Sequence, residues 1–331
     1  MASQRAERYR KLTWILGGTS VLLAIALIAV LGMSVGGQRD TGDDVREAAA
    51  TESDHADVSG GAPAGVADMG PVSVITDDPT CAEWTRIGSA LLEVQNRVLW
   101  FERDGSIPAV EWLPEQVDMY TTVARAMGSV AAQVGILARD TPHRAMREIY
   151  EQLAVHAREV INRIPQYQAS DIHLFRAADT LVGAASSICA AARSGAAQAR
   201  APLTPPAAPP TAPSPAAPEN NRTTLLADNP SICNEWVPLS TDYRNQIPDW
   251  VDDELYLGDI TTPARIQFAD ASEEVSRRSN NAVAEDLAVL GAQYLRAYVA
   301  AVPTYGPADR ALLDAADNLA KVVDHGCAGT V

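Results

Sequence analysis

The sequence contains four cysteines, whose thiols are the groups in this chain most able to form covalent or metal bonds. Cys81 and Cys189 flank one stretch of helical pattern, and Cys233 and Cys327 flank a second. Two cysteines about 100 residues apart, with only His325 nearby in sequence, make poor zinc spacing. Four cysteines allow three pairings, and one of these keeps each bond within its own stretch. We predict the disulfides Cys81–Cys189 and Cys233–Cys327, and no metal. The alternative is that the cysteines bind a metal ion.

A second group of candidate residues is an acidic stretch with interleaved aromatic side chains. Its members are Asp249, Trp250, Asp252, Asp253, Glu254 and Tyr256. Carboxylates this close together could meet a hard cation or a basic partner. The spacing and the turn glycine of a calcium loop are absent, so the alternative is a solvated acidic loop whose aromatic residues pack against the protein. We expect a loop here, a candidate for interaction, and no cofactor.

The other residues capable of chemistry form no recognised catalytic motif. The histidines include no His-Glu-x-x-His zinc motif, and His156 falls on an apolar helix stripe, which favours a buried histidine over a ligand. The Glu-x-x-His spacing of di-iron bundles, the Gly-x-Ser-x-Gly turn, a phosphate loop and a dinucleotide fingerprint are also missing. The sequence therefore predicts no catalytic, cofactor-binding or metal-binding residue, and we expect a protein that is not an enzyme.

Helices must position these residues, because apolar side chains recur at helical spacing and strand alternation is absent. In the first stretch one stripe runs from Trp84 to Phe101 and a second from Tyr120 to Leu137, and two more helices follow. In the second stretch we expect a loop over residues 247–256 and a helix that begins at Thr262. An up-down-up-down bundle returns to the end where it began, which brings its two cysteines together.

The two stretches resemble each other. Cys81-Ala-Glu83-Trp84 matches Cys233-Asn-Glu235-Trp236 at an offset of 152, and Pro165-Gln-Tyr167, Leu174 and Cys189 match Pro303-Thr-Tyr305, Leu312 and Cys327 at an offset of 138. The second stretch is thus 14 residues shorter. The sequence predicts a duplicated domain. The expected fold is all-α, with one N-terminal transmembrane helix followed by two tandem disulfide-closed four-helix-bundle-like domains.

The N-terminal region has the pattern of a membrane anchor. Residues 12–35 carry no charge over 24 positions, and about 20 residues span a bilayer as a helix. Basic residues precede this segment and acidic residues follow it, so the positive-inside rule predicts a cytoplasmic tail over 1–11 and extracytoplasmic C-terminal domains. A cleaved signal peptide is the alternative, but its apolar core would be shorter. Gly32 and Gly36 form a small-xxx-small pair that weakly indicates a homodimer.

Two segments lack a helical period and divide the rest of the chain. Residues 36–76 predict a flexible stalk, and residues 196–226 a Pro/Ala-rich linker, because eight prolines lie between 202 and 218 and favour an extended spacer. The first bundle is therefore expected over 77–195 and the second over 227–331. We expect the two bundles to fold independently, each closed by its own disulfide.

The charge excludes one class of function. The chain has 42 acidic against 26 basic residues, a formal net charge of -16, and a general nucleic-acid binder would need a basic face. Hydrophobic residues make up 47%, so the chain is not disordered throughout.

The repeated Cys-x-Glu-Trp motif, with Pro303-Thr-Tyr305 after a helix over 292–298, resembles a group of uncharacterised mycobacterial membrane proteins. The resemblance implies an actinobacterial source and no activity. The sequence favours a membrane-anchored, extracytoplasmic binding or scaffolding protein of the bacterial cell envelope. Its partner would be an envelope protein or a cell-wall or lipid component. An enzyme acting on envelope glycan or lipid, or an accessory sensor subunit, is the alternative.

Overall fold

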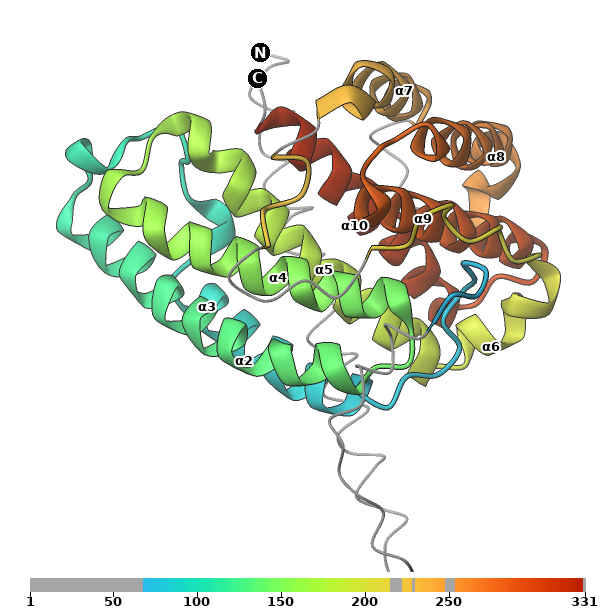
Figure 1. Ribbon diagram of the computed structural model, residues 1–331, viewed down its shortest axis with the longest axis horizontal. Coiled ribbons are helices and arrows are strands. Elements are labelled where there is room, and N and C mark those ends of the chain that lie inside the picture. Colours follow the sequence, from blue (N-terminus) through green and yellow to red (C-terminus); the bar gives the residue numbers. More distant parts are fainter. Residues whose placement is uncertain (1–67, 215–221, 228–229, 248–253, 330–331) are drawn as a thin grey trace, which may run out of the picture. The chain divides into compact units, whose positions relative to one another are not determined.

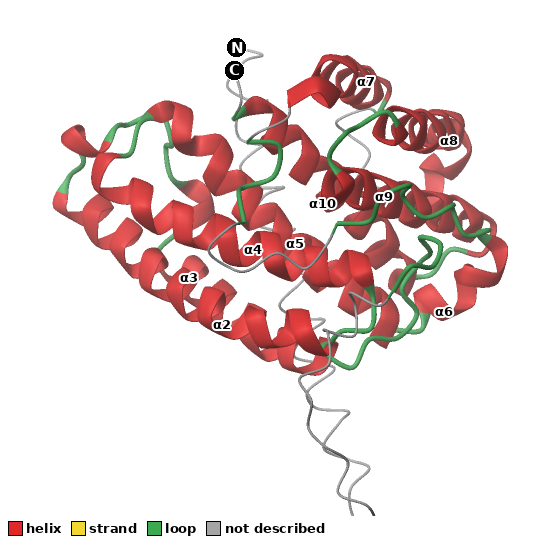
Figure 2. Cartoon of the chain, in the orientation of Figure 1, coloured by secondary structure: helices red, strands yellow, loops and turns green. Residues whose placement is uncertain are grey.

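A computed structural model of the chain describes residues 68–214, 222–227, 230–247 and 254–329 (Figure 1). The tail over 1–11, the anchor over 12–35 with Gly32 and Gly36, and most of the stalk lie outside these residues. Within them the regular structure is helical, loops connect the helices, and the β-structure is one isolated antiparallel bridge between Val72 and Ala207 (Figure 2). The all-α prediction is confirmed for this part of the chain.

Four long helices make up the first repeat, and four more make up the second. The first set is α2 (Cys81–Arg97), α3 (Pro114–Asp140), α4 (Arg144–Arg163) and α5 (Ile172–Arg193). The second is α7 (Cys233–Gln246), α8 (Glu254–Arg277), α9 (Ala282–Ala301) and α10 (Arg310–Ala328). Between the repeats lie the short helix α6 (Ala196–Arg200) and the 3-10 turn η6 (Ala201–Leu203).

The apolar stripes explain why these segments are helical. In α3, Pro114 occupies the first helical position, where its missing N–H would have no partner. Tyr120, Val123 and Met127 then recur at steps of three and four, and all are buried. In α9, Asn281 caps the first turn by accepting a 3.0 Å bond from the backbone N–H of Ala284. Local caps and one-sided burial thus define the helices.

Each repeat is a closed ring of helices, because its first helix packs against its last. A disulfide joins those two helices in each case, Cys81 to Cys189 and Cys233 to Cys327, with Cα–Cα distances of 5.2 and 5.3 Å. This is the predicted pairing. In each repeat, the tryptophan three residues after the first cysteine donates a hydrogen bond to the last helix, at equivalent positions. Trp84 donates to Ser186 at 3.2 Å, and Trp236 donates to Asp324 at 2.8 Å.

The duplication is visible element by element. The bounds of α4 coincide with those of α9 after a shift of 138 residues, as do the turns η4 (Ile164–Gln166) and η9 (Val302–Thr304). So do η5 (Ala169–Asp171) and η10 (Pro307–Asp309). The sequence match therefore corresponds to a structural repeat.

The two repeats pack together through equivalent helices. Helices α5 and α10 run antiparallel against each other, with Gly183 against Asn318 near the middle and His173 against His325 at one end. The described residues of both repeats belong to one compact unit. The two repeats are therefore in contact, with α5 lying against α10 (Figure 1), and the independent folding of each bundle stays a prediction.

The described part of the Pro-rich linker lies against the helices between Thr204 and Pro209. After α6, Thr204 and Ala207 are buried, and Ala207 exchanges two 2.9 Å backbone bonds with Val72. Arg277 donates to the carbonyls of Ala208 and Pro209. Prolines remove N–H donors but leave every carbonyl free to accept, so this segment can lie against the helices.

Helix α8 begins earlier than the sequence predicts. It begins at Glu254, eight residues before the predicted start at Thr262, and Pro263 lies inside it. Part of the predicted acidic loop is therefore the first turn of a helix. Among the described residues, one helix, Ala169–Arg193, is long and apolar enough to cross a membrane, and half of it is buried inside the protein. It includes α5, which forms the junction between the repeats.

Candidate functional site

A fully buried ion pair joins the two repeats. Arg144 at the start of α4 donates to both carboxylate oxygens of Asp286 on α9, at 2.8 and 3.0 Å. The same guanidinium donates to the carbonyl oxygens of Asp68 and Gly70, at 2.7 and 3.2 Å. Bidentate pairing and carbonyl acceptors satisfy most of its donors, as a buried arginine requires.

One turn further along α4, a second arginine pairs with carboxylates of its own helix. Arg147 donates to Glu148 at 3.2 Å and to Glu151 at 2.9 Å, and Arg222 donates to Glu151 at 2.9 Å. Burial raises the pKa of Glu148 well above its usual range, and the negative charge of Asp286 adds to the effect. Because these carboxylates are buried and paired with arginine, the cluster serves as a clamp between the repeats.

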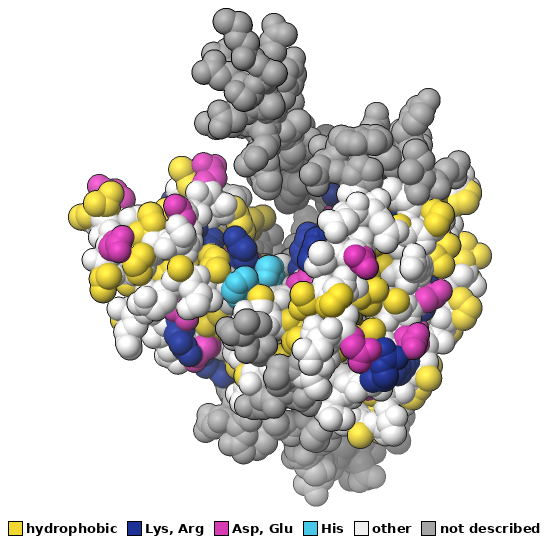
Figure 3. Space-filling model, turned by 90° about the horizontal axis from the view of Figure 1, so that it is seen from above, with side chains coloured by type: hydrophobic (Ala, Val, Ile, Leu, Met, Phe, Trp, Pro, Cys, Tyr) yellow, Lys and Arg dark blue, Asp and Glu magenta, His cyan; other side chains and the backbone are white. Residues whose placement is uncertain are grey.

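A groove with a volume of about 1390 Å³ lies at the opposite end of the same junction. We call it the histidine groove. It is lined by Val155, His156, Arg158, Glu159, Arg163, Ser170, Asp171, His173, Leu174, Ala177, residues 222–225, Ala227, His325, Gly326, Ala328 and Gly329. Its walls therefore come from α4 and α5 of the first repeat, and from the C-terminal turn of α10 and the segment before α7. In the view from above, histidine side chains lie in a hollow with Lys and Arg side chains on both sides (Figure 3).

Two histidines, one from each repeat, face each other in this groove. The ring centroids of His173 and His325 are 6.2 Å apart. Burial lowers the pKa of His173, and the charge of Arg176 lowers it further. Burial also lowers the pKa of His325 to about 4, so this ring is neutral at ordinary pH. Neutral imidazoles keep one N–H each, which makes them hydrogen-bond donors toward a ligand.

Cations surround the histidine pair. The charges of Arg176 on α5 and Lys321 on α10 lower the pKa of His325, and the charge of Asp324 acts in the opposite direction. Lys321 also interacts through its charge with Asp317. A smaller hollow of about 390 Å³ continues from the groove past Lys321 toward Arg244, which pairs with Asp324. In a chain of net charge -16, this concave cationic surface is suited to an anionic ligand.

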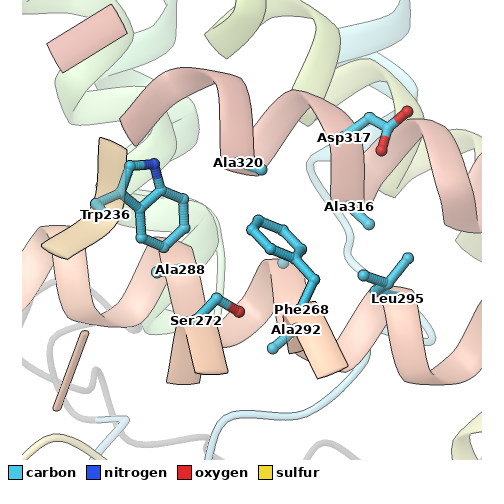
Figure 4. Close-up of a pocket in the computed structure, with 10 residues that line it drawn as sticks. Trp236, Phe268, Ser272, Ala288, Ala292, Leu295, Ala316, Asp317 and Ala320 are labelled. Carbon is cyan, nitrogen blue, oxygen red and sulfur yellow. The ribbon is translucent and has the colours of Figure 1, made fainter. Parts of the chain in front are cut away.

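A third hollow is a small internal cavity of the second repeat (Figure 4). It has a volume of about 10 Å³, room for a single water molecule, and lies between Trp236, Phe268 and small residues of α9 and α10. Asp317 at its edge has a raised pKa, because it is buried. Its counterpart in the first repeat, Asp179, has a pKa raised to about 6 by burial. Asp179 accepts bonds from Gln95 and Trp100, so these carboxylates are part of the core.

The predicted site residues and the groove do not coincide. The four cysteines lie in disulfides, and Asp249, Trp250, Asp252 and Asp253 lie outside the described residues. Glu254 and Tyr256 lie in the first turn of α8 instead of a loop. The groove residues were missed because no motif marks them. An alignment of the two repeats could have found them, because at the offset of 138 His173 aligns with Ala311 and Arg163 aligns with Ala301.

The described residues form no group of three or more His, Cys, Asp or Glu side chains arranged to hold a metal ion. His156, which the apolar stripe predicts to be buried, is 2% exposed and bonds the carbonyl of Gln152 at 2.9 Å. Its pKa falls to about 4 because it is buried. It is a core histidine at the edge of the groove.

Comparison with known proteins identifies relatives but no solved structure. Residues 63–331 match the family described as mycobacterial ESX-1 associated protein. An uncharacterised protein of Mycolicibacterium smegmatis (strain MKD8) is 38% identical over 332 aligned positions, which cover 95% of this chain and 85% of that protein. No solved structure matches.

Proposed function

Since the chain belongs to the family of mycobacterial ESX-1 associated proteins, we propose that it is a binding or scaffolding component of the mycobacterial cell envelope with a secretion-related role. The observation that carries the proposal is the histidine groove. It is a concave surface built from both repeats, and arginine and histidine side chains outnumber carboxylates among the residues that line it. Such a surface is suited to holding a partner.

The proposal places the compact unit outside the cytoplasm, attached to the membrane through residues 12–35. The two disulfides support this placement, because disulfides persist in oxidising compartments. The low aromatic content and the net charge of -16 also suit a protein in an aqueous envelope layer.

We further propose that the protein is not an enzyme. A glycan- or lipid-acting enzyme would need a pair of carboxylates that face a substrate cleft. Two carboxylates with a raised pKa instead lie in the clamp, where Glu148 contacts Arg147, and in the core, where Asp179 contacts Trp100. Both places are packed with protein side chains.

Affinity capture from mycobacterial membranes with the tagged full-length chain tests the proposal. We expect envelope proteins of the ESX-1 machinery to be enriched over a capture with a tagged, unrelated single-pass protein. Deletion of the gene should reduce ESX-1-dependent secretion, and re-expression of the chain should restore it. Unchanged secretion together with a capture that matches the control would contradict the proposed role.

A further inference from the structure

The two repeats form two equivalent grooves, and the chain itself fills one of them. The filled groove lies over α9, η10 and α10 of the second repeat, where α6 and η6 pack. Ala196 and Ala197 of α6 are buried there, and Thr204 and Ala207 are buried further along. Residues 196–207 thus act as an intramolecular ligand, which consists of a short helix followed by an extended segment.

Polar contacts at both ends hold this segment in its groove. Arg200 donates two bonds to the carboxylate of Asp309, at 3.1 and 3.0 Å, and a third to the hydroxyl of Thr304, at 3.0 Å. Ala207 pairs with Val72 through two backbone bonds of 2.9 Å. The filled groove therefore recognises an arginine and a stretch of extended backbone.

The histidine groove occupies the equivalent place on the first repeat. Its residues Asp171, Leu174 and Ala177 correspond to Asp309, Leu312 and Ala315 of the filled groove at the offset of 138. Its wall over 222–227 corresponds, at the offset of 152, to the segment over 70–75 that contains Val72. Among the described residues no helix fills this groove as α6 fills the other.

The two grooves differ in charge. Five positions in the histidine groove or at its rim carry a basic side chain or a histidine where the filled groove has a neutral or acidic residue. At the offset of 138 the pairs are Arg163 with Ala301, His173 with Ala311, Arg176 with Asp314, Lys321 with Gly183 and His325 with Ser187. Glu159 in place of Ala297 is a change in the opposite direction. Asp309, which pairs with Arg200 in the filled groove, is matched by Asp171 in the histidine groove, where it lies 3.5 Å from Arg163 of the same repeat. The cations that distinguish the histidine groove lie at the other positions.

From this geometry we propose that the histidine groove binds an acidic polypeptide segment of a partner protein, in the manner in which residues 196–207 fill the equivalent groove. The segment forms a short helix over α5 and continues as extended chain beside residues 223–225. Its carboxylates lie near Arg163, Arg176 and Lys321. The inference rests on the proposed binding function and names the chemistry of the partner.

Two synthetic peptides test the proposal on the full-length chain in detergent. One has the sequence of residues 194–209, and the other is identical except for Arg200→Glu. We expect the Glu peptide to bind about tenfold or more tightly than the Arg peptide at low salt, and its affinity to fall as salt rises. Fluorescence anisotropy of labelled peptides measures both.

Charge reversal in the protein provides the matched control. The double variant Arg176→Glu/Lys321→Glu should lose about tenfold or more in affinity for the Glu peptide. The double variant Arg125→Glu/Arg139→Glu changes the net charge by the same amount on the exposed face of α3 and should bind the peptide as the parent does. Equal effects of the two variants would show that net charge alone attracts the peptide, and would overturn the proposal.

Three other outcomes would also overturn it: stronger binding of the Arg peptide, complete displacement of the Glu peptide by millimolar inorganic phosphate, or charge-dependent binding of vesicles with anionic lipids in place of both peptides. The second would indicate a small-anion site, and the third a lipid-headgroup site. Failure of the proposed function is distinct, because membrane capture would then yield no ESX-1 component even with the parent groove. If the variant Arg176→Glu/Lys321→Glu still captured ESX-1 components, the proposed binding of an acidic segment in the groove would be refuted, and the proposed envelope role would stand.

Discussion

The two repeats share a framework and differ in what they present to the surroundings. Both close a ring of four helices with a disulfide, and in both a tryptophan of the first helix donates to the last helix, to Ser186 in one repeat and to Asp324 in the other. The second repeat contributes the acidic groove that binds Arg200, and the first contributes the cationic histidine groove. The duplication conserved the interior while the grooves diverged in charge.

The same contrast appears inside the junction between the repeats. Glu148 and Asp286 occupy equivalent positions on α4 and α9, 138 residues apart. Asp286 accepts a bidentate arginine, whereas Glu148 keeps one buried oxygen without a hydrogen-bond partner. Asp286 thus joins the repeats through an ion pair, whereas the environment of Glu148 disfavours the charged form of its carboxyl group.

The largest effect is expected from separating the repeats. Residues 68–195 or 222–329 produced alone would expose the helix faces that meet at Gly183 and Asn318, and would lose the Arg144–Asp286 pair. We expect neither piece to unfold cooperatively on its own. Circular dichroism melts and gel filtration measure this, and co-expression of both pieces serves as the control. Two monomeric pieces with sharp melting transitions would support the prediction of independent bundles.

The next effect compares the two equivalent carboxylates. Asp286→Asn leaves the buried Arg144 with only the 3.9 Å contact to Asp68 as an ion pair, and should lower the free energy of unfolding by about 3–5 kcal/mol. Glu148→Gln should cost less than about 1 kcal/mol, because the raised pKa already disfavours the ionised form. Urea unfolding of both variants at neutral pH provides the comparison. Equal losses would show that both positions act as charged members of the clamp.

A smaller effect depends on pH. Asp179 has a folded pKa of about 6, above its usual value, so its contribution to stability is complete at low pH and is lost as pH rises through 6. The loss amounts to at most about 3 kcal/mol. The variant Asp179→Asn should flatten the dependence of unfolding free energy on pH between about 4 and 6. Asp317→Asn should act in the same direction, because the pKa of Asp317 is also raised by burial. An unchanged pH profile in Asp179→Asn would contradict this assignment.

The sequence predicted the helices, the repeat and the disulfides because each has a local or periodic signal. The stripe from Trp84 to Phe101 is a local signal, although α2 ends at Arg97 and a 3-10 turn follows. The match of Cys189 with Cys327 at a constant offset is a periodic one. Such patterns depend on one-sided burial, which a single chain reveals.

The packing of one repeat on the other has no comparable signal. The contact of α5 with α10 depends on small residues such as Gly183, and the burial of residues 204–207 depends on a groove formed by distant helices. Composition predicted an extended spacer because prolines favour it in isolation. The groove was missed for the same reason, since His173 and His325 lie 152 residues apart and meet only in the folded protein.

The smallest effect distinguishes the two grooves at their equivalent aspartates. Arg200→Ala removes a bidentate pair with Asp309 that is 15% and 6% exposed, and should loosen residues 196–207 by about 1–2 kcal/mol. Arg163→Ala removes a 3.5 Å contact with Asp171 and a 2.7 Å bond to Glu159. Because this arginine is 54% exposed, the change should alter stability by less than about 1 kcal/mol. Hydrogen exchange of the Val72 and Ala207 amides reports the first effect directly, because both donate across the bridge that closes the filled groove. Faster exchange in Arg200→Ala but not in Arg163→Ala would support the distinction between a groove that holds its own ligand and one that is open to a partner. Equal protection in both variants would mean that Arg200 does not hold residues 196–207 in their groove. The comparison of the histidine groove with a groove that binds a peptide segment would then lose its basis.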